Sequence, residues 1–228
     1  MIIIADKKIP KKAKEKLAHF GQLILLETEG ITYNAISGHP DIFICKINDH
    51  LIIAPNLPEN YKQTLRDLNV SFIEGEEPVG EKYPESAKYN VVVTEKFLMH
   101  NFRYTDSAIT NREEDLDLIH LNQGYSRCNL LPLKNDHFIT SDEGVKRVLQ
   151  NHNLDVLYVN PENIQLPGFK HGFIGGACGV VDNSLFILGS LKNYKEGEKI
   201  NDYLQSLNFK IIELFDGPLF DGGSILFL

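Results

Sequence analysis

Short apolar segments recur along the chain on either side of a pair of polar residues. The arrangement occurs at Asn48-Asp49, Thr94-Glu95, Asn135-Asp136 and Asp182-Asn183. Each instance predicts a tight β-hairpin, because Asn and Asp tolerate the positive φ angles that two-residue primed turns require. The strands expected beside the four turns are 42–44 and 51–53, 91–93 and 97–99, 130–131 and 138–139, and 180–181 and 185–187.

The predicted turns are almost evenly spaced. Successive turns lie 46, 41 and 47 residues apart, a period in the range of repeat architectures. One further interval of 46 residues from Asp182 reaches residue 228, so a fifth hairpin would have its first strand at 224–228. Residues 1–4 are apolar and can supply its second strand, which would leave no exposed sheet edge where the two ends meet. The repeat therefore predicts a ring of five units closed by the terminal strands.

Between the hairpins the apolar residues change to helical spacing. This pattern predicts amphipathic helices at 10–20, 58–68, 142–151 and 196–207, followed by strands at 23–26, 70–73, 156–159 and 210–214. In the remaining unit the helix is less clear, and 108–116 is the best candidate before a strand at 118–121. A WD-type propeller has a similar period but no helix in its blades. We therefore predict an α/β fold, a pseudo-symmetric α/β propeller of five units forming a single domain over residues 1–228.

Composition narrows the function classes. The 228 residues are 43% hydrophobic and 10% aromatic, enough for a large core, and the net charge of −8 argues against a nucleic-acid partner. No apolar run approaches the roughly 20 residues of a membrane helix, and the opening apolar segment meets Asp6 too early for a secretory signal. A cytoplasmic protein without a membrane partner is expected, and a homo-oligomer is compatible with the sequence.

Metal and nucleotide sites are not predicted. Cys45, Cys128 and Cys178 are odd in number and widely spaced, which fits neither a disulfide framework nor a metal knuckle. The eight histidines show no metal-ligand spacing, so no metal and no cofactor are expected. The glycine-rich segment 172–179 lacks the Lys-Ser/Thr ending of a P-loop and precedes a predicted strand, which argues against a nucleotide.

Four segments carry a family resemblance. They are Gly38-His39-Pro40-Asp41, Gln123-Gly124-Tyr125-Ser126-Arg127-Cys128, residues 166–169 with 172–176, and Asp221-Gly222-Gly223-Ser224-Ile225-Leu226. With the five-unit period, they make the chain resemble an uncharacterised family of the pentein fold, the α/β propeller of guanidino-group-modifying enzymes. The resemblance implies relatives among amidinotransferases, arginine and agmatine deiminases and dimethylarginine hydrolases.

One departure from those enzymes bears on activity. Their nucleophilic cysteine follows a glycine-rich stretch near the C-terminus, whereas here Gly222-Gly223 is followed by 224–228 without a cysteine. The resemblance therefore implies either a hydrolase or amidinotransferase for a small guanidino or amidino compound that uses a relocated cysteine, or a non-catalytic ligand- or protein-binding module. The second alternative stays open because the fold also carries a ribosome anti-association factor.

Candidate site residues come from the segments that enter the first strand of each hairpin, since these segments should meet at one mouth of the ring. Acidic side chains predominate there and suit a small cationic ligand, because a guanidinium pairs with a carboxylate through two parallel hydrogen bonds. The alternative for each Asp is a role in a turn. The substrate-binding candidates are His39, Asp41, Arg127, Cys178, Asp216 and Asp221.

The catalytic candidates are Cys128 as the nucleophile and His171 as its base. Arg127 would lower the pKa of the Cys128 thiol if the two side chains meet, although successive strand residues point to opposite faces. Cys178 lies among glycines that would let a ligand approach. The alternatives are buried, inert thiols and a solvent-exposed His171. Cys45 is expected to be inert, because it lies near the turn of its hairpin.

Overall fold

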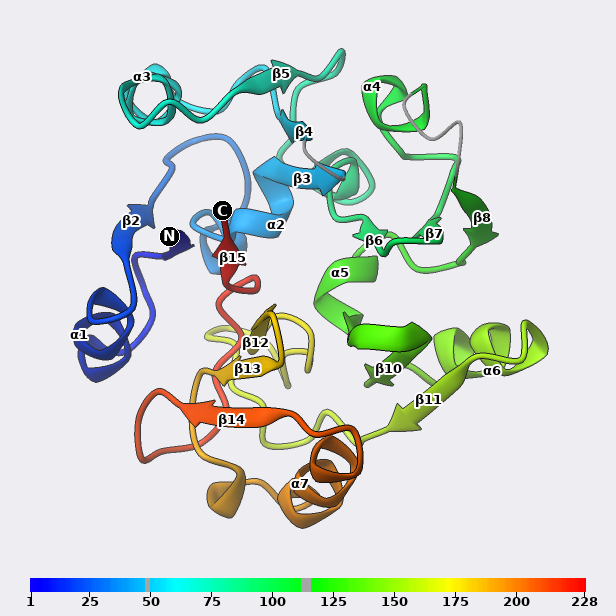
Figure 1. The fold of residues 1–228 in the computed structure, drawn as a ribbon. Helices are drawn as coiled ribbons and strands as arrows, with labels where there is room; N and C mark the ends of the chain where they lie inside the picture. Colours follow the sequence, from blue (N-terminus) through cyan, green and yellow to red (C-terminus); the bar gives the residue numbers. More distant parts are fainter. Residues whose placement is uncertain (48–49, 112–115) are drawn as a thin grey trace.

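In the computed structural model, which describes residues 1–47, 50–111 and 116–228, five three-stranded sheets lie around a common centre (Figure 1). In each sheet an inner strand runs antiparallel to the middle strand, and the outer strand runs parallel to it. From inner to outer, the sheets are β15 (Leu226–Phe227), β1 (Ile2–Asp6) and β2 (Gln22–Leu26); β3 (Ile44–Ile47), β4 (His50–Ile53) and β5 (Phe72–Glu74); β6 (Val92–Val93), β7 (Phe97–His100) and β8 (Asp117–His120); β9 (Leu130–Pro132), β10 (His137–Thr140) and β11 (Asp155–Tyr158); and β12 (Cys178–Val181), β13 (Ser184–Ile187) and β14 (Lys210–Glu213).

Helices connect the middle strands to the outer strands, as parallel pairing requires. They are α1 (Lys11–Ala18), α3 (Glu59–Asp67), α6 (Glu143–Asn151) and α7 (Gly197–Ser206), which confirm the four predicted helices. In α6 the Asp142 carboxylate accepts hydrogen bonds from the Gly144 and Val145 amides, and Val145 and Leu149 are buried. None of the described helices is long and apolar enough to cross a membrane.

The remaining unit has the short helix α4 (Ser107–Thr110) where 108–116 was expected. Asp106 caps α4 by accepting a hydrogen bond from the Ala108 amide. Residues 112–115 of that expectation lie outside the described residues. Two further short helices, α2 (Pro40–Phe43) and α5 (Ser126–Asn129), lie near the centre, and there are 3-10 turns at Asn34–Ile36, Glu85–Ala87, Lys134–Asp136 and Leu191–Asn193.

The predicted hairpins are present, but their turns are not all formed in the same way. Asn135 and Asp136 have φ of 57° and 59°, and Asp182 has φ of 51°, which is the tolerance that the prediction assumed. At Thr94 the turn instead uses a side chain, because Thr94 Oγ1 accepts hydrogen bonds from the Lys96 and Phe97 amides. The Asn48-Asp49 turn lies outside the described residues.

Three predicted strands begin two residues later than expected, at Ile44, Phe72 and Leu226. Residues 42–43 belong to α2, because Pro40 at its first position favours a helical turn, and β3 starts only at Ile44. Similarly, β15 covers only Leu226–Phe227, since Ser224 has a φ of 68° that interrupts extended backbone. The helical turn α2 is one of the elements that carry candidate residues to the centre.

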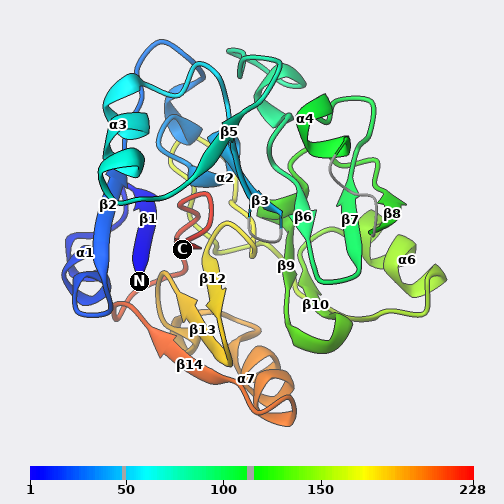
Figure 2. The same cartoon turned by 45° about the horizontal axis from the view of Figure 1, so that its top comes forward.

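The terminal strands pair as predicted. β15 lies antiparallel to β1, with Ile3 opposite Phe227 and Ile4 opposite Leu226. The Ile2 amide donates to the Leu228 carbonyl and the Leu228 amide donates to the Ile2 carbonyl, both at 2.9 Å. The two ends of the chain consequently lie side by side (Figures 1 and 2).

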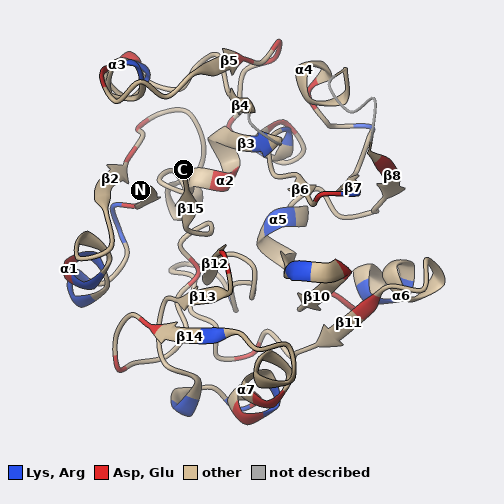
Figure 3. Ribbon diagram, in the orientation of Figure 1, with Lys and Arg blue, Asp and Glu red and all other residues tan. Residues whose placement is uncertain are grey.

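Buried apolar side chains join each sheet to its neighbours in the sequence. Four clusters do this, and each contains residues from at least two sheets. Representative members are Ile4, Ile52 and Leu98; Met99 and Phe138; Leu131 and Leu185; and Phe186 and Ile3. Charged residues are found on the outer helices and on many strands and loops, and near the centre α2 carries the acidic Asp41 and α5 the basic Arg127 (Figure 3).

Candidate functional site

The segments that enter the five inner strands meet at the centre and hydrogen-bond to one another in succession. The bonds run from the Asp41 amide to the Gly223 carbonyl (3.2 Å), from Asn90 Nδ2 to the Asp41 carbonyl (3.2 Å), from the Arg127 amide to the Asn90 carbonyl (3.1 Å), from the Gly176 amide to the Cys128 carbonyl (2.9 Å) and from the Ser224 amide to the Gly176 carbonyl (2.8 Å). The succession returns to the segment where it began. Candidate residues from distant parts of the sequence are therefore held at fixed positions.

Cys128 lies in α5 and is surrounded by polar groups. Its Sγ donates a hydrogen bond to Asp41 Oδ2 at 3.2 Å, and Asn90 Nδ2 donates to Sγ at 3.3 Å. Burial, the Asp41 and Asp221 charges and the hydrogen bond to Asp41 raise the pKa of the Cys128 thiol well above its ordinary value. Contrary to expectation, the neighbouring Arg127 does not bring this pKa below its ordinary value, because the free-energy cost of burying a thiolate is the larger effect. In the ligand-free protein Cys128 is a protonated thiol.

Arg127, next to Cys128, interacts electrostatically with Asp41, Cys128 and Cys178, and among these three Asp41 has the largest effect on the pKa of Arg127. Its Nη1 donates to the Gly175 carbonyl at 3.1 Å. Its charge opposes the effect of burial on Asp41, whose pKa is nevertheless raised to about 6. Burial is thus the largest influence on this carboxyl group too.

Two other buried carboxyl groups surround the same centre. Asp221 accepts hydrogen bonds from the Phe173 amide at 2.9 Å and the Gly223 amide at 3.0 Å, and burial raises its pKa to about 7. Asp6, at the end of β1, accepts a hydrogen bond from the Lys8 amide at 2.6 Å, and burial raises its pKa to about 6. Because removal from water opposes ionisation of all these groups, a cation beside them would favour their charged forms.

His39 completes the cluster and is only 1% exposed. Burial lowers the pKa of its imidazole to about 3, so the ring is neutral near pH 7. Its Nε2 lies 3.8 Å from Asp6 Oδ2, and its Nδ1 has no hydrogen-bond partner within the part of the chain that the structure describes. The ring packs on Gly223, where a Cβ would lie 2.1 Å from His39 Cβ and where φ is +65°. This position therefore requires glycine.

A cavity of about 530 Å³, here called the acid cavity, leads to one side of this cluster. Asp6, His39 and Asp221 line it together with the aromatic rings of Tyr33 and Phe169. A second cavity of about 470 Å³ is lined by Asp41, Arg127 and Ser224, and it lies toward the hairpin turns, near Lys46 and Thr94. The cluster is thus approached from two sides, and Cys128 lines neither cavity.

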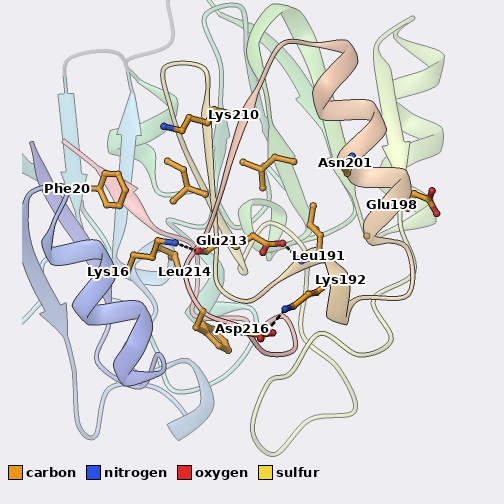
Figure 4. Close-up of a pocket in the computed structure, with 14 residues that line it drawn as sticks. Lys16, Phe20, Leu191, Lys192, Glu198, Asn201, Lys210, Glu213, Leu214 and Asp216 are labelled. Atoms are coloured by element: carbon orange, nitrogen blue, oxygen red, sulfur yellow. Dashed lines mark hydrogen bonds and ion pairs between the residues drawn. The ribbon is translucent and has the colours of Figure 1, made fainter.

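The other candidate residues lie apart from this cluster or deeper in the core. Asp216 is exposed on the surface, where it forms an ion pair with Lys192 at 3.0 Å beside a separate cavity of about 940 Å³ (Figure 4). The His171 ring lies against Phe173, and its Nδ1 is 3.0 Å from the Gly172 carbonyl. The structure brings His39, rather than His171, to Cys128.

Cys178 and Cys45 are buried thiols within strands. Cys178 begins β12 and Cys45 lies in β3. Burial raises the pKa of each to about 12, although the Arg127 charge acts in the opposite direction on Cys178. Neither thiol is ionised near pH 7.

Sequence reasoning missed three residues of this region. Asp6 ends an apolar strand, Asn90 directly precedes the Val91 hairpin, and Tyr33 lies in a loop. Asn90 was detectable, because, like Asp41, it directly precedes an apolar segment that leads into a predicted hairpin. The Tyr33 hydroxyl donates to Tyr125 Oη at 3.2 Å, and no feature of the sequence indicated that contact.

The fold matches known proteins, although no curated protein matches the chain in sequence. The amidinotransferase SxtG from Microseira wollei, of the saxitoxin biosynthetic pathway, is 11% identical with a TM-score of 0.56, over 93% of this chain and 87% of that one. DDAH from Pseudomonas aeruginosa, solved with citrulline, is 9% identical with a TM-score of 0.54, over 93% and 91%. Agmatine deiminase from C. jejuni is 12% identical with a TM-score of 0.55, over 93% and 75%.

These matches confirm the resemblance to the pentein fold of guanidino-modifying enzymes. At such low identity they concern the fold and leave the chemistry to the residues of the site. A sequence model of a family of unknown function matches residues 4–226, almost the whole chain. The chain therefore belongs to that family, DUF6873.

Proposed function

We propose that this protein binds a small guanidino or amidino cation in the acid cavity. The observation that carries the proposal is the pair of buried carboxyl groups, Asp6 and Asp221, in the wall of a cavity of about 530 Å³. A guanidinium is planar and pairs with a carboxylate through two parallel hydrogen bonds. Tyr33 and Phe169, whose ring centroids lie 5.6 Å apart, offer aromatic surface to the same ligand.

Binding of a cation should release protons from the carboxyl groups of the site, less than one proton per bound cation on average. The pKa of Asp221 is raised to about 7 and that of Asp6 to about 6, so Asp221 is about half protonated at pH 7. A cation beside these groups lowers both pKa values. Proton release on binding is therefore a signature of the proposed site.

The solved structures with this fold support the class of ligand. Among them are an amidinotransferase, an agmatine deiminase and an arginine dihydrolase, and one was solved in complex with citrulline. For the present chain they suggest arginine, agmatine and citrulline as the first compounds to test.

A second candidate is a hydrolase or amidinotransferase in which Cys128 is the relocated nucleophile. It is favoured by the 3.2 Å contact between Cys128 Sγ and Asp41 Oδ2, and by a His39 ring nitrogen within 4.8 Å of ligand atoms of both. The thiol would give its proton to one of these groups, and the sulfur would attack the central guanidino carbon. A C–N bond of that carbon would then break, and the nitrogen would leave as ammonia or an amine that takes up the proton. Water in a hydrolase, or an acceptor amine in an amidinotransferase, would next attack the same carbon, break the C–S bond and return the thiol. In this role His39 replaces His171. Burial of Cys128 favours the binding function as the first choice, because attack requires a thiolate.

We also propose that the five sheets form one closed α/β propeller and a single domain over residues 1–228. The succession of hydrogen bonds between entry segments, the clusters that join neighbouring sheets and the terminal pairing all support this. A single cooperative unfolding transition, the same by fluorescence and circular dichroism, is the expected result. Two separate transitions would contradict the single domain.

Isothermal titration calorimetry with arginine, agmatine and citrulline tests the binding function. We expect agmatine or arginine to bind with a heat that changes with the ionisation enthalpy of the buffer, because protons are released. Asp221→Asn and Asp6→Asn should weaken binding, since each removes a carboxylate from the cavity wall. Asp216→Asn is the matched control, because Asp216 is exposed beside a different cavity, and it should bind like the wild type.

The opposite result is also informative. If none of the compounds binds, or if Asp221→Asn binds as tightly as the wild type, the acid cavity is not the ligand site. Release of ammonia, urea or a transferred amidino group that Cys128→Ser abolishes would favour the enzyme. Binding without turnover would favour the binding module.

A further inference from the structure

Two buried polar atoms at the centre have no partner among the described residues. They are Nδ1 of His39 and Oδ1 of Asp41. These two residues are 1% and 4% exposed, respectively. A buried acceptor or donor without a partner destabilises the folded state, because it has lost its hydrogen bonds to water. Two such atoms on neighbouring residues indicate that the site is built to contact something that the chain itself does not supply.

The side chains around these atoms form a metal-ligand set. His39, Asp41 and Cys128 each offer one ligand atom, and the three atoms lie within 4.8 Å of one another. Two ligands at the usual zinc distances of about 2.3 Å for sulfur and 2.0 Å for oxygen, in tetrahedral geometry, are about 3.5 Å apart. The observed separation of 3.2 Å between Cys128 Sγ and Asp41 Oδ2 is close to that value.

We propose that His39, Asp41 and Cys128 bind one Zn²⁺ ion, with a fourth position left for water or a ligand. Nitrogen, oxygen and sulfur donors together favour zinc over the hard cations Mg²⁺ and Ca²⁺, which prefer oxygen ligands alone. Three protein ligands with an open fourth position are the arrangement of catalytic rather than structural zinc.

The surroundings of the three ligands fit a divalent cation. Asp6 lies 3.8 Å from the His39 ring, where it can orient the imidazole as carboxylates do behind zinc-bound histidines. Asn90 Nδ2 donates a hydrogen bond of 3.3 Å to Cys128 Sγ. The charges of Arg127 and Lys8 oppose binding, since they act on Asp41 and on His39, respectively. The carboxyl groups of Asp6, Asp41 and Asp221 and the thiol outnumber them. A dication would offset this surplus of acidic groups.

An ion can reach the site from either cavity, because His39 lines the acid cavity and Asp41 lines the second one. The inference goes beyond the proposed binding of a guanidino cation, because it assigns Cys128 as a metal ligand. Bound zinc would hold Cys128 as a thiolate, and that sulfur would then not be free as a nucleophile. Asp221 is not one of the three ligands and remains in the cavity wall.

Cobalt binding to the full chain tests the site. After treatment with a chelator, the protein is incubated with Co²⁺, which substitutes for Zn²⁺ and gives a thiolate-to-cobalt charge-transfer band when a cysteine is a ligand. We expect one equivalent of Co²⁺ with this band, and its loss when one equivalent of Zn²⁺ is added. Refolding in the presence of Co²⁺ gives access to the buried site if entry into the folded protein is slow.

Variants assign the ligands. Cys128→Ser should eliminate the band, and Asp41→Asn should weaken Co²⁺ binding by more than about 100-fold, since even residues behind the ligands contribute 10- to 100-fold. Cys45→Ala and Cys178→Ala are the matched controls, because both remove buried thiols outside the set, and they should keep the band. Circular dichroism verifies that each variant is folded.

The zinc site is contradicted if the wild type shows no band after incubation and after refolding with Co²⁺. It is also contradicted if the band persists in folded Cys128→Ser. These readouts need no guanidino compound. Cobalt binding without agmatine or arginine binding would refute the proposed function alone, and the reverse result would refute the zinc site alone.

Discussion

The acid cavity at the centre and the cavity between α1 and α7 both contain charged residues, but only the carboxyl groups of the acid cavity, those of Asp6 and Asp221, are buried. The outer cavity is larger, at about 940 Å³ against about 530 Å³. Its acid Asp216 is exposed, and the hydrogen bond and charge of Lys192 lower its pKa, as in a surface ion pair (Figure 4). At the centre, burial raises the pKa of Asp221 to about 7.

The comparison teaches that cavity size is a poor guide to a site in this molecule. A solvated ion pair is stable without any ligand and contributes little. In a carboxyl group kept from water, by contrast, a nearby cation strongly stabilises the ionised form. The following experiments separate the centre from the periphery, in order of decreasing effect.

Removal of residues 225–228 should have the largest effect. The truncation removes β15, including the buried side chain of Phe227, and also the buried side chain of Ile225. It leaves the edge of β1 without its hydrogen-bonding partner. We expect a loss above about 4 kcal/mol, enough to prevent folding at ordinary temperature. Ile211→Ala in the wall of the outer cavity is the comparison, and it should remain folded. A truncated protein that melts with the wild type would show that the terminal pairing is dispensable.

Two glycines with similar backbone angles should differ strongly when replaced by alanine. Gly223 has φ of +65° and a Cβ there would lie 2.1 Å from His39 Cβ, whereas Gly30 has φ of +70° and open space around it. Gly30→Ala should lower the free energy of unfolding by about 1 kcal/mol, because alanine is strained in the left-handed conformation. Gly223→Ala should cost at least about 2 kcal/mol more, because the central segments must move. Equal losses in urea unfolding would mean that the centre adapts easily.

The pH dependence of stability should report the buried carboxyl groups. The folded pKa of Asp221 is about 7 and its ordinary value is 3.8, so the folded protein binds more protons between these values. Its contribution to stability is therefore largest below pH 4 and is lost as pH rises through 7, on the order of 2 to 4 kcal/mol. Asp221→Asn removes this loss, so its stability relative to the wild type should rise from pH 4 to pH 7.

Urea unfolding of both proteins across this range is the measurement. The difference between them is needed because His39 has the opposite dependence: its pKa is lowered to about 3, so its contribution is lost as pH falls below 6.5. Asp216→Asn should show no such trend. A constant difference between Asp221→Asn and the wild type would indicate that Asp221 is not shielded from water.

Loss of the surface ion pair should have the smallest effect. Lys192→Ala removes the partner of Asp216, but the solvent screens both charges. We expect an unchanged melting temperature at 0.15 M salt by differential scanning calorimetry. A clear drop would mean that the outer cavity contributes more to stability than its exposure suggests.

Much of the fold could be predicted from the sequence because its signals are local and repeated. The apolar periodicity placed α1, α3, α6 and α7 to within two residues. The interval between turns led to the pairing of residues 1–4 with 224–228, although these segments are at opposite ends of the sequence. Where a local signal was misread, as at residues 42–43, the cause was again local, because Pro40 favours a helical turn.

The site could be predicted only in part. The rule that entry segments meet at the centre identified His39, Asp41, Cys128 and Asp221, but the same rule included Asp216 and His171 and missed Asp6. Periodicity specifies which segments approach one another, while the position of each side chain along a loop depends on packing. Asp216 and Asp221 are five residues apart, yet one is on the surface and the other is buried.

The sequence by itself determined the repeat, the order of helices and strands and the pairing of the two ends, because hydrophobic spacing and turn residues act over a few positions. Only the tertiary structure decided the protonation of the centre, with Cys128 a thiol, His39 neutral and the carboxyl pKa values raised. Burial is the largest cause of each of these shifts. Burial depends on which segments surround a group in space, and those segments are contributed by all five repeats.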